Sequence, residues 1–248
     1  MDKFQSKSAI DKKKAEEGLD PYADFDGSPG ELFFLKLSHF IGKNRKSIGI
    51  GFLVLFASLA GVIGFLEFRD NQRQSATAKF EEMEVLLQRQ MVGVDQRIQA
   101  YEAFLLENPA IELRLWKELS KLHSDKGDWS TAASYLEKSA KQIDEPKEMK
   151  AYYFGMAGVY RDAGGELELS LQNLEIASSL LETNLEVPSF KAWLNYHLGR
   201  VQILTGKKES GIENLKKVLL AEPKSESQLA EIKTKASYLI LKTQSEVP

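Results

Sequence analysis

Residues 47–66 form an uncharged run of twenty residues, SIGIGFLVLFASLAGVIGFL. At a rise of about 1.5 Å per residue, a helix of this length is about 30 Å long, which matches the hydrocarbon core of a bilayer. A buried core helix is one alternative, but a helix that is apolar on every face is rare in a small soluble domain. The run therefore predicts a transmembrane helix.

A cleaved signal peptide is a second alternative for the same run. Ser58-Leu59-Ala60 has the small-x-small pattern of a cleavage site. Apolar residues continue after it over 61–66, however, and the preceding residues 1–46 would make an unusually long leader. An uncleaved anchor is favoured.

Basic residues on the two sides of the run indicate its orientation. Four Lys or Arg side chains lie in the twenty residues before it (27–46), against three in the twenty residues after it (67–86). Five more lysines lie in the first fourteen residues. Because cytoplasmic flanks are enriched in Lys and Arg, the pattern predicts a cytoplasmic N-terminus and translocation of residues 67–248.

The residues before the run divide into two parts. Residues 1–27 are polar, charge-mixed and poor in large aliphatic side chains, which predicts a disordered cytoplasmic tail. Residues 28–46 open with Ser28-Pro29, an N-cap followed by proline at the first helical position, and continue as a mostly apolar stretch. We interpret 28–46 as a juxtamembrane interfacial helix with Lys43–Lys46 at the headgroups. The alternative is a hydrophobic start to the anchor.

Beyond the apolar run, every periodic stretch has the 3.6-residue spacing of a helix, and short Gly, Asp or Pro clusters separate the stretches. One pattern then recurs. Each copy has large side chains on one face of a first helix, a glycine at a turn, and a second helix with small residues where the two helices meet. The copies cover 113–146, 152–181 and 193–223.

These copies resemble tetratricopeptide repeats, which are helix hairpins of about 34 residues. The turn glycines Gly127, Gly164 and Gly206 give periods of 37 and 42 residues. A weaker hairpin over 76–109 precedes the copies, and the amphipathic segment 228–242 follows them as a capping helix. The resemblance implies an all-α chain, in which a single transmembrane helix at 47–66 is followed by a right-handed solenoid of tetratricopeptide-like helix hairpins over 67–248.

The order of the parts resembles one bacterial family. A tail, FFLKLSHFIGKNRKSIGIGFLVL, one span and then RDNQRQSATAKFEEM leading into AYEAFLLENPAIELRLWKELSKLHSDKGDW are similar to the single-pass ancillary subunit of the SecYEG translocon. The resemblance implies an inner-membrane protein whose repeat domain faces the periplasm. It also implies association with translocon subunits, periplasmic chaperones or emerging chains. The longer tail and the longer third linker at 182–189 depart from the family and leave the partner set open.

Composition and motifs argue against an enzyme or a nucleic-acid binder. The net charge is -3 and the pI is about 5.8. The chain has no cysteine, which excludes thiolate nucleophiles and Cys-based zinc sites, and its three histidines are too scattered to suggest a metal cage. Phosphate-loop, HExxH and GxSxG motifs are absent from the sequence. The sequence therefore predicts no enzyme activity, no catalytic or metal site, no cofactor and no small-molecule substrate.

Protein binding is the function that remains. Stacked helix pairs form a concave groove lined by their first helices, and cations and aromatics there suit an extended or helical peptide or an acidic partner. The alternative is an ordinary structural role, because aromatic residues in repeats usually pack in the core and cations usually lie on the surface. From helix phase, the groove candidates are Lys117, Lys121, Phe154, Arg161, Tyr196 and Arg200.

The predicted span offers a second contact surface. Ala57, Ala60, Gly61 and Gly64 lie on one stripe and form two small-xxx-small pairs. Such pairs let another helix approach closely in lipid, although small residues are also common in anchors that pack against nothing. The stripe is therefore the candidate transmembrane packing surface.

These observations favour a membrane-anchored protein–protein interaction scaffold at the bacterial inner membrane, as an ancillary component of the Sec translocon. The alternative is a tetratricopeptide adaptor in envelope-assembly or cell-division complexes. Crosslinking from the span separates the two, because translocon subunits would be captured only under the first.

Overall fold

The computed structural model describes residues 26–181, 188–221 and 226–245, which fall into two compact units divided after Arg69. The described residues are all-α, with no strand among them. Nearly all of the predicted tail (1–27) and most of the predicted long linker (182–189) lie outside the described residues.

Helix α2 (Pro29–Arg89) contains the apolar run, and its first turn is held by a capping box. The Ser28 hydroxyl and backbone N–H both donate to the Glu31 carboxylate, and the Glu31 N–H donates back to Ser28 Oγ over 3.3 Å. The helix thus begins where the Ser28-Pro29 pair predicts. Asn44 interrupts the helical backbone with φ -106° and ψ 15°.

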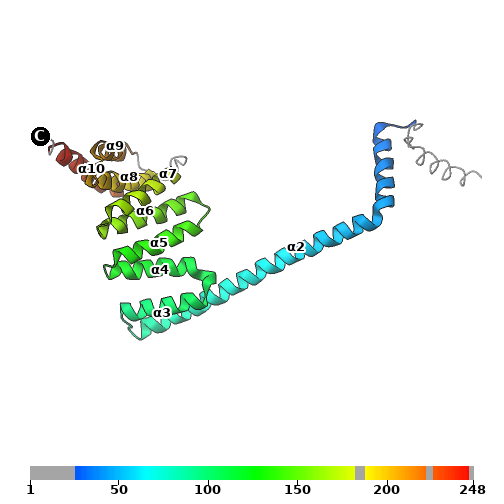
Figure 1. Cartoon of the computed structure of the whole chain (residues 1–248), viewed down its shortest axis with the longest axis horizontal. Coiled ribbons are helices and arrows are strands. Elements are labelled where there is room, and N and C mark those ends of the chain that lie inside the picture. The colour runs from blue at the N-terminus through cyan, green and yellow to red at the C-terminus, as the bar shows by residue number, and fades with distance from the viewer. Residues whose placement is uncertain (1–25, 182–187, 222–225, 246–248) are drawn as a thin grey trace, which may run out of the picture. The chain divides into compact units, whose positions relative to one another are not determined.

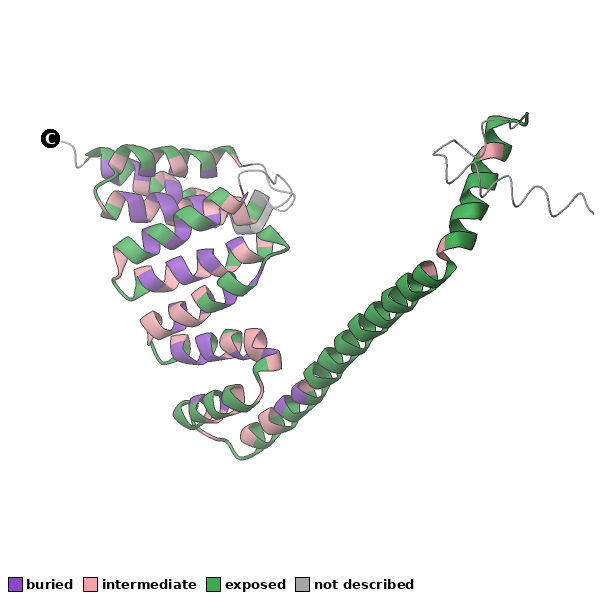
Figure 2. Ribbon diagram, turned by 45° about the vertical axis from the view of Figure 1, so that its right-hand side comes forward, coloured by how far each residue is buried: buried purple, intermediate pink, exposed green. Residues whose placement is uncertain are grey.

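The apolar part of α2 contains no buried residue, and nearly all of it is exposed, as Figure 2 shows. An 18-residue window of this helix has a mean hydropathy of 2.4, and none of that window is buried. A core helix of a soluble domain would be mostly buried, so this finding disfavours that alternative. The helix is compatible with a single-pass membrane anchor.

The second unit is a series of antiparallel helices, each packed against the next in chain order (Figure 1). Its first helix is the C-terminal part of α2, and a short 3₁₀ turn (Pro109–Ile111) joins α3 to α4. The predicted weak hairpin before the repeats and the predicted terminal helix are both confirmed. The remaining helices are α3 (Val94–Glu107), α4 (Glu112–Asp125), α5 (Trp129–Gln142), α6 (Lys147–Ala163), α7 (Leu167–Leu181), α8 (Pro188–Leu204), α9 (Lys208–Leu220) and α10 (Glu226–Ser245).

The turns inside the three hairpins share a left-handed glycine. Gly127, Gly165 and Gly206 have φ values of 78°, 78° and 85°, a conformation that costs other residues strain. Gly164, the turn glycine expected from the sequence, does lie in the second turn, but it is right-handed (φ -81°) and ends α6 as its C-cap. With Gly165 in its place, the turns are separated by 38 and then 41 residues.

The two helices of each hairpin cross at small residues. In the first hairpin, the Ser120 hydroxyl on α4 donates a hydrogen bond of 2.8 Å to the Ala132 carbonyl oxygen on α5. In the third hairpin, a β-carbon added at Gly199 of α8 would lie only 2.8 Å from the Gly211 carbonyl oxygen of α9. The crossing pairs are Ser120 with Ala132, Gly158 with Ser170, and Gly199 with Gly211. These helix pairs, their crossings and their turns give the tetratricopeptide type of helical-repeat fold.

The last turns of α2 complete the core at the start of the repeat domain. Phe80 and Tyr101 are both 0% exposed, and their rings meet edge to face with centroids 5.0 Å apart. The Tyr101 hydroxyl donates to Glu84 Oε1 over 2.8 Å, which also ties α3 to α2. The residues that follow the apolar run therefore serve as the first helix of the repeat domain.

Removing that helix is expected to destabilise the domain. A fragment of residues 90–248 loses Ala76 and Phe80, so Tyr101 and Ile98 become exposed and Arg114 loses the Phe80 ring under its guanidinium. We expect this fragment to melt at a lower temperature than a fragment of residues 70–248, measured by circular dichroism. Equal melting temperatures would show that the α2 segment adds nothing to the fold.

Candidate partner-binding site

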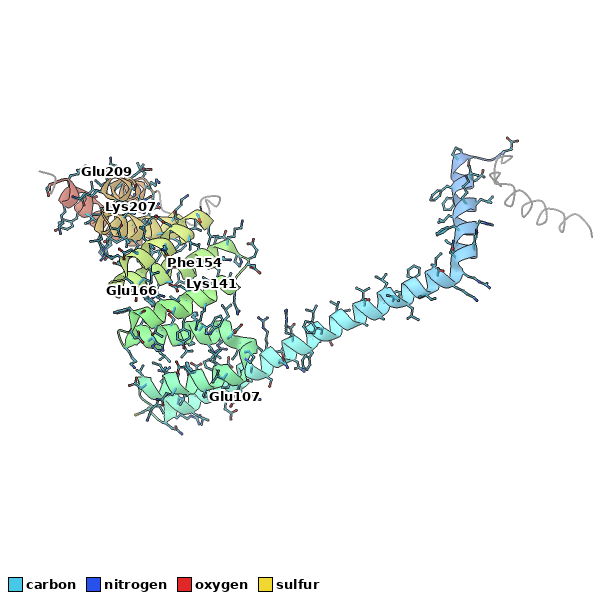
Figure 3. The ribbon with its side chains drawn as sticks, viewed as in Figure 1. Glu107, Lys141, Phe154, Glu166, Lys207 and Glu209 are labelled. Atoms are coloured by element: carbon cyan, nitrogen blue, oxygen red, sulfur yellow. The ribbon has the colours of Figure 1, made fainter. Side chains whose placement is uncertain are left out.

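Two of the predicted groove residues belong to the interior. Phe154 on α6 is 6% exposed and packs in a core cluster with Leu174 and Leu194 (Figure 3). The expectation that it lines a groove is wrong, because the helix turns this position toward α7 and α8.

Arg161 is buried as well, with a side chain that is 10% exposed. Its Nε and Nη2 donate to the two carboxylate oxygens of Glu137 over 2.9 and 3.0 Å, and a second ion pair joins it to Glu166. The hydrogen bonds that Arg161 donates to Glu137 raise the pKa of Arg161 above its ordinary value. Arg161 therefore joins α6 to α5 and is not a groove cation.

The other four predicted residues lie at or near the surface. Lys117 and Lys121 are exposed on α4. Tyr196 is half-buried on α8 and packs on the core cluster formed with α9 and α10. Arg200 forms an ion pair with Asp162 of α6, so its charge is already matched.

The structure instead shows an aromatic cleft, which we define by the residues that line it. It has a volume of about 350 Å³ and is formed by the first helices of two hairpins together with the terminal helix α10. Its lining is mostly apolar, as in most ligand-binding clefts. The lining residues are Tyr152 and Met156 of α6, Ser189, Phe190 and Trp193 of α8, and Leu229 and Ile232 of α10.

A glycine on α6 lets the rings of α8 approach closely. A β-carbon at Gly155 would lie 3.1 Å from Trp193 Cζ3 and 3.6 Å from Phe190 Cζ. The Phe190 and Trp193 rings stack with centroids 5.5 Å apart and an interplanar angle of 19°, and Phe190 meets Tyr152 at 5.8 Å. The aromatic rings therefore support one another and give the cleft a fixed wall.

His197 contacts the Trp193 ring, with centroids 4.6 Å apart. Burial, with a smaller contribution from the charge of Lys235, lowers the pKa of His197 to about 4. The imidazole is neutral at pH 7, so it places no charge beside the aromatic rings. No described residue hydrogen-bonds to its buried Nδ1.

Sequence reasoning missed Tyr152 and Trp193, although a signal was present. The two residues are 41 residues apart, and so are Gly158 and Gly199, which occupy equivalent positions at helix crossings. Aligning the copies by their crossing residues would have placed Tyr152 and Trp193 at the same position of successive first helices.

The small-residue stripe lies in the exposed apolar part of α2. Ala57, Ala60, Gly61 and Gly64 are all exposed, and a β-carbon at either glycine would have nothing within 4 Å. A packing role for this stripe stays a prediction.

The helix pairs, their crossings and their turns define a helical-repeat fold of the tetratricopeptide type. No protein-family model matches the chain, and no curated protein matches it. Among solved structures, the one titled "Crystal structure of MamA" is similar over 63% of this chain and 90% of that chain, with 20% sequence identity and a TM-score of 0.43. Within the described residues, no group of three or more His, Cys, Asp or Glu side chains is placed to hold a metal ion.

Proposed function

We propose that this protein is a membrane-anchored scaffold that binds other proteins in the aromatic cleft. The observation that carries the proposal is the cleft itself, because Tyr152, Phe190 and Trp193 form a pre-arranged apolar surface on the first helices of the repeats. Large aromatic side chains in well-packed pockets contribute most of the binding energy at protein interfaces.

The proposed setting is the bacterial inner membrane at the Sec translocon. The N-terminus is cytoplasmic, residues 47–66 span the membrane and the repeat domain is periplasmic, where it holds chaperones or emerging chains. Two observations support this setting: the resemblance in the order of the parts, and the small excess of basic residues before the span. The stripe of Ala57, Ala60, Gly61 and Gly64 is the proposed contact with translocon subunits.

Removing either of two aromatic side chains from the cleft is expected to abolish most partner capture. Trp193→Ala and Tyr152→Ala each remove an aromatic wall, and losses at such positions are about 2 kcal/mol or more, or at least about thirtyfold in affinity. The measurement is co-purification of partners with the full chain from mild-detergent extracts. Ile176→Ala is a matched control, because Ile176 is an exposed apolar residue on α7 outside the cleft lining.

The identity of the captured proteins decides the setting. A photo-crosslinking residue at position 189, in the cleft lining, should capture periplasmic chaperones or secreted chains, and one at position 58, next to the small-residue stripe, should capture translocon subunits. Capture of division or envelope-assembly proteins at both positions would support the adaptor alternative. If Trp193→Ala and Ile176→Ala retain the same partners, the cleft is not the binding site.

A further inference from the structure

We propose that residues 29–43 form an in-plane amphipathic helix that binds the anionic surface of the membrane. The proposal rests on the proposed anchor, because it needs residues 47–66 to cross the same bilayer. Its ligand is the headgroup and upper acyl region of anionic lipids, and its role is to fix how the chain enters the membrane.

The helix has one strongly apolar face. At about 100° per residue, five large side chains fall within an arc of about 120°, and their exposed fractions range from 39% to 69%. Glu31, Ser38 and His39 fall outside this arc, together with Leu32 and Leu35. A face of this width suits burial at the boundary between headgroups and acyl chains. The five residues, named here the aromatic face, are Phe33, Phe34, Leu37, Phe40 and Ile41.

The break at Asn44 separates this helix from the span. Asn44 is the non-helical residue inside α2, and its side-chain amide donates to the Phe40 carbonyl oxygen over 3.0 Å. Figure 1 shows the bend that it produces in α2. A continuous helix would carry residues 29–43 along the axis of the span, whereas a break allows them to lie across it. The aromatic face can then contact lipid while 47–66 crosses the bilayer.

The basic side chains beside the break favour lipids with negatively charged headgroups. Residues 26–46 contain four basic side chains, Lys36, Lys43, Arg45 and Lys46, against the two acidic side chains Asp26 and Glu31. Three of these cations flank Asn44, which places them at headgroup depth if 47–66 spans. Basic side chains near an anionic surface are attracted to it, so these cations favour negatively charged headgroups. Continuity with the span is what favours a lipid surface over a soluble acidic protein as the partner.

The chain has no cysteine, so single-cysteine variants of the full chain can report the position of each side chain. Spin labels placed one at a time over residues 30–42 are measured in vesicles of phosphatidylcholine alone and of phosphatidylcholine with one quarter phosphatidylglycerol. We expect accessibility to oxygen and to a water-soluble nickel chelate to vary oppositely, with a period close to 3.6 residues. Labels at 34, 37 and 41 should be protected from the chelate, and labels at 31 and 38 should be exposed to it.

Phosphatidylglycerol should increase the protection at 34, 37 and 41. In the triple variant Lys43→Gln, Arg45→Gln, Lys46→Gln, phosphatidylglycerol should no longer increase this protection. The accessibility of the labels along residues 30–42 should still vary with a period close to 3.6 residues. Protection that is insensitive to phosphatidylglycerol would overturn the selection of anionic lipid.

Labels at Val54 and Leu59 distinguish failure of this proposal from failure of the anchor. If the chelate reaches them, residues 47–66 do not span and the proposed membrane-anchored function is wrong. If they are protected while 34 and 37 are as accessible as 31 and 38, the in-plane helix is wrong and the anchor stands. Uniform protection over 30–42 would likewise overturn the in-plane helix, because the segment would then be buried on all sides.

Discussion

Replacing Gly199 with alanine is expected to destabilise the repeat domain by about 2 kcal/mol. The new β-carbon would lie 2.8 Å from the Gly211 carbonyl oxygen and 3.0 Å from Leu215 Cγ, and a backbone oxygen cannot move aside as a side-chain end can. Alanine is otherwise about 1 kcal/mol better than glycine inside a helix, so the loss would occur against the intrinsic preference. The measurement is the free energy of unfolding of a fragment of residues 70–248 in urea.

Two further variants test whether the helix crossing is the cause. Gly211→Ala should have a similar effect, because its β-carbon would lie 2.7 Å from the Gly199 carbonyl oxygen. Ser210→Ala is the matched control, since this neighbouring residue of α9 is exposed, and its effect should stay within about 0.5 kcal/mol. A stabilised Gly199→Ala variant would contradict a close crossing of α8 and α9.

Replacing Arg161 with methionine is expected to cost about 3 kcal/mol, because it leaves the Glu137 carboxylate without its charged partner in a mostly buried position. Asn173 would remain as the neutral hydrogen-bond donor to Glu137, over 2.7 Å. The double variant Arg161→Met, Glu137→Leu should recover part of the loss, since it removes the uncompensated carboxylate but leaves the buried Asn173 amide without its acceptor. Urea unfolding of the single and double variants provides the comparison.

The decrease in unfolding free energy caused by Arg161→Met should also depend on pH. Burial acts to raise the pKa of Glu137, but hydrogen bonds from Arg161 and Asn173 outweigh it and lower the pKa below its ordinary value. A carboxyl group with a lowered folded pKa stabilises the protein above its unfolded pKa, and this contribution disappears as the pH falls through the folded pKa. The difference between wild type and Arg161→Met should therefore be full at pH 7 and shrink in acid. A difference that is constant from pH 7 to pH 3 would contradict an ionic role for Arg161.

The fold could be predicted from the sequence because its determinants are local. A hairpin needs an apolar face on each helix, a glycine that can turn, and small residues at the crossing, and all three lie within about 40 residues of chain. Gly127 and Gly206 satisfy this pattern directly. In the second turn Gly164 and Gly165 are adjacent, and only the backbone angles distinguish the C-cap, Gly164, from the left-handed residue, Gly165.

The cleft could not be predicted with equal success, because it depends on helix phase. The first helix of a repeat packs on its own partner and on neighbouring repeats, so apolar residues occupy most of its circumference. Phe154 and Tyr152 are two positions apart, about 200° around the helix, yet one is core and the other lines the cleft. Arg161 was wrongly predicted as a groove cation for a different reason. Its partner Glu137 is 24 residues earlier on another helix, and sequence alone does not show that pairing.

Terminal helices of repeat arrays open more readily than internal ones, because they have neighbours on one side only. The aromatic cleft takes Leu229 and Ile232 from α10, the last described helix, which packs on α8 and α9. A protein bound in the cleft, as we propose, would bind only while α10 is docked. Mass action would then make detachment of α10 harder by about 2.7 kcal/mol when the partner is at a hundred times its Kd. Amide hydrogens of α10 would then exchange with solvent about a hundredfold more slowly in the complex. Slower amide exchange in α10 would therefore report that the cleft is occupied.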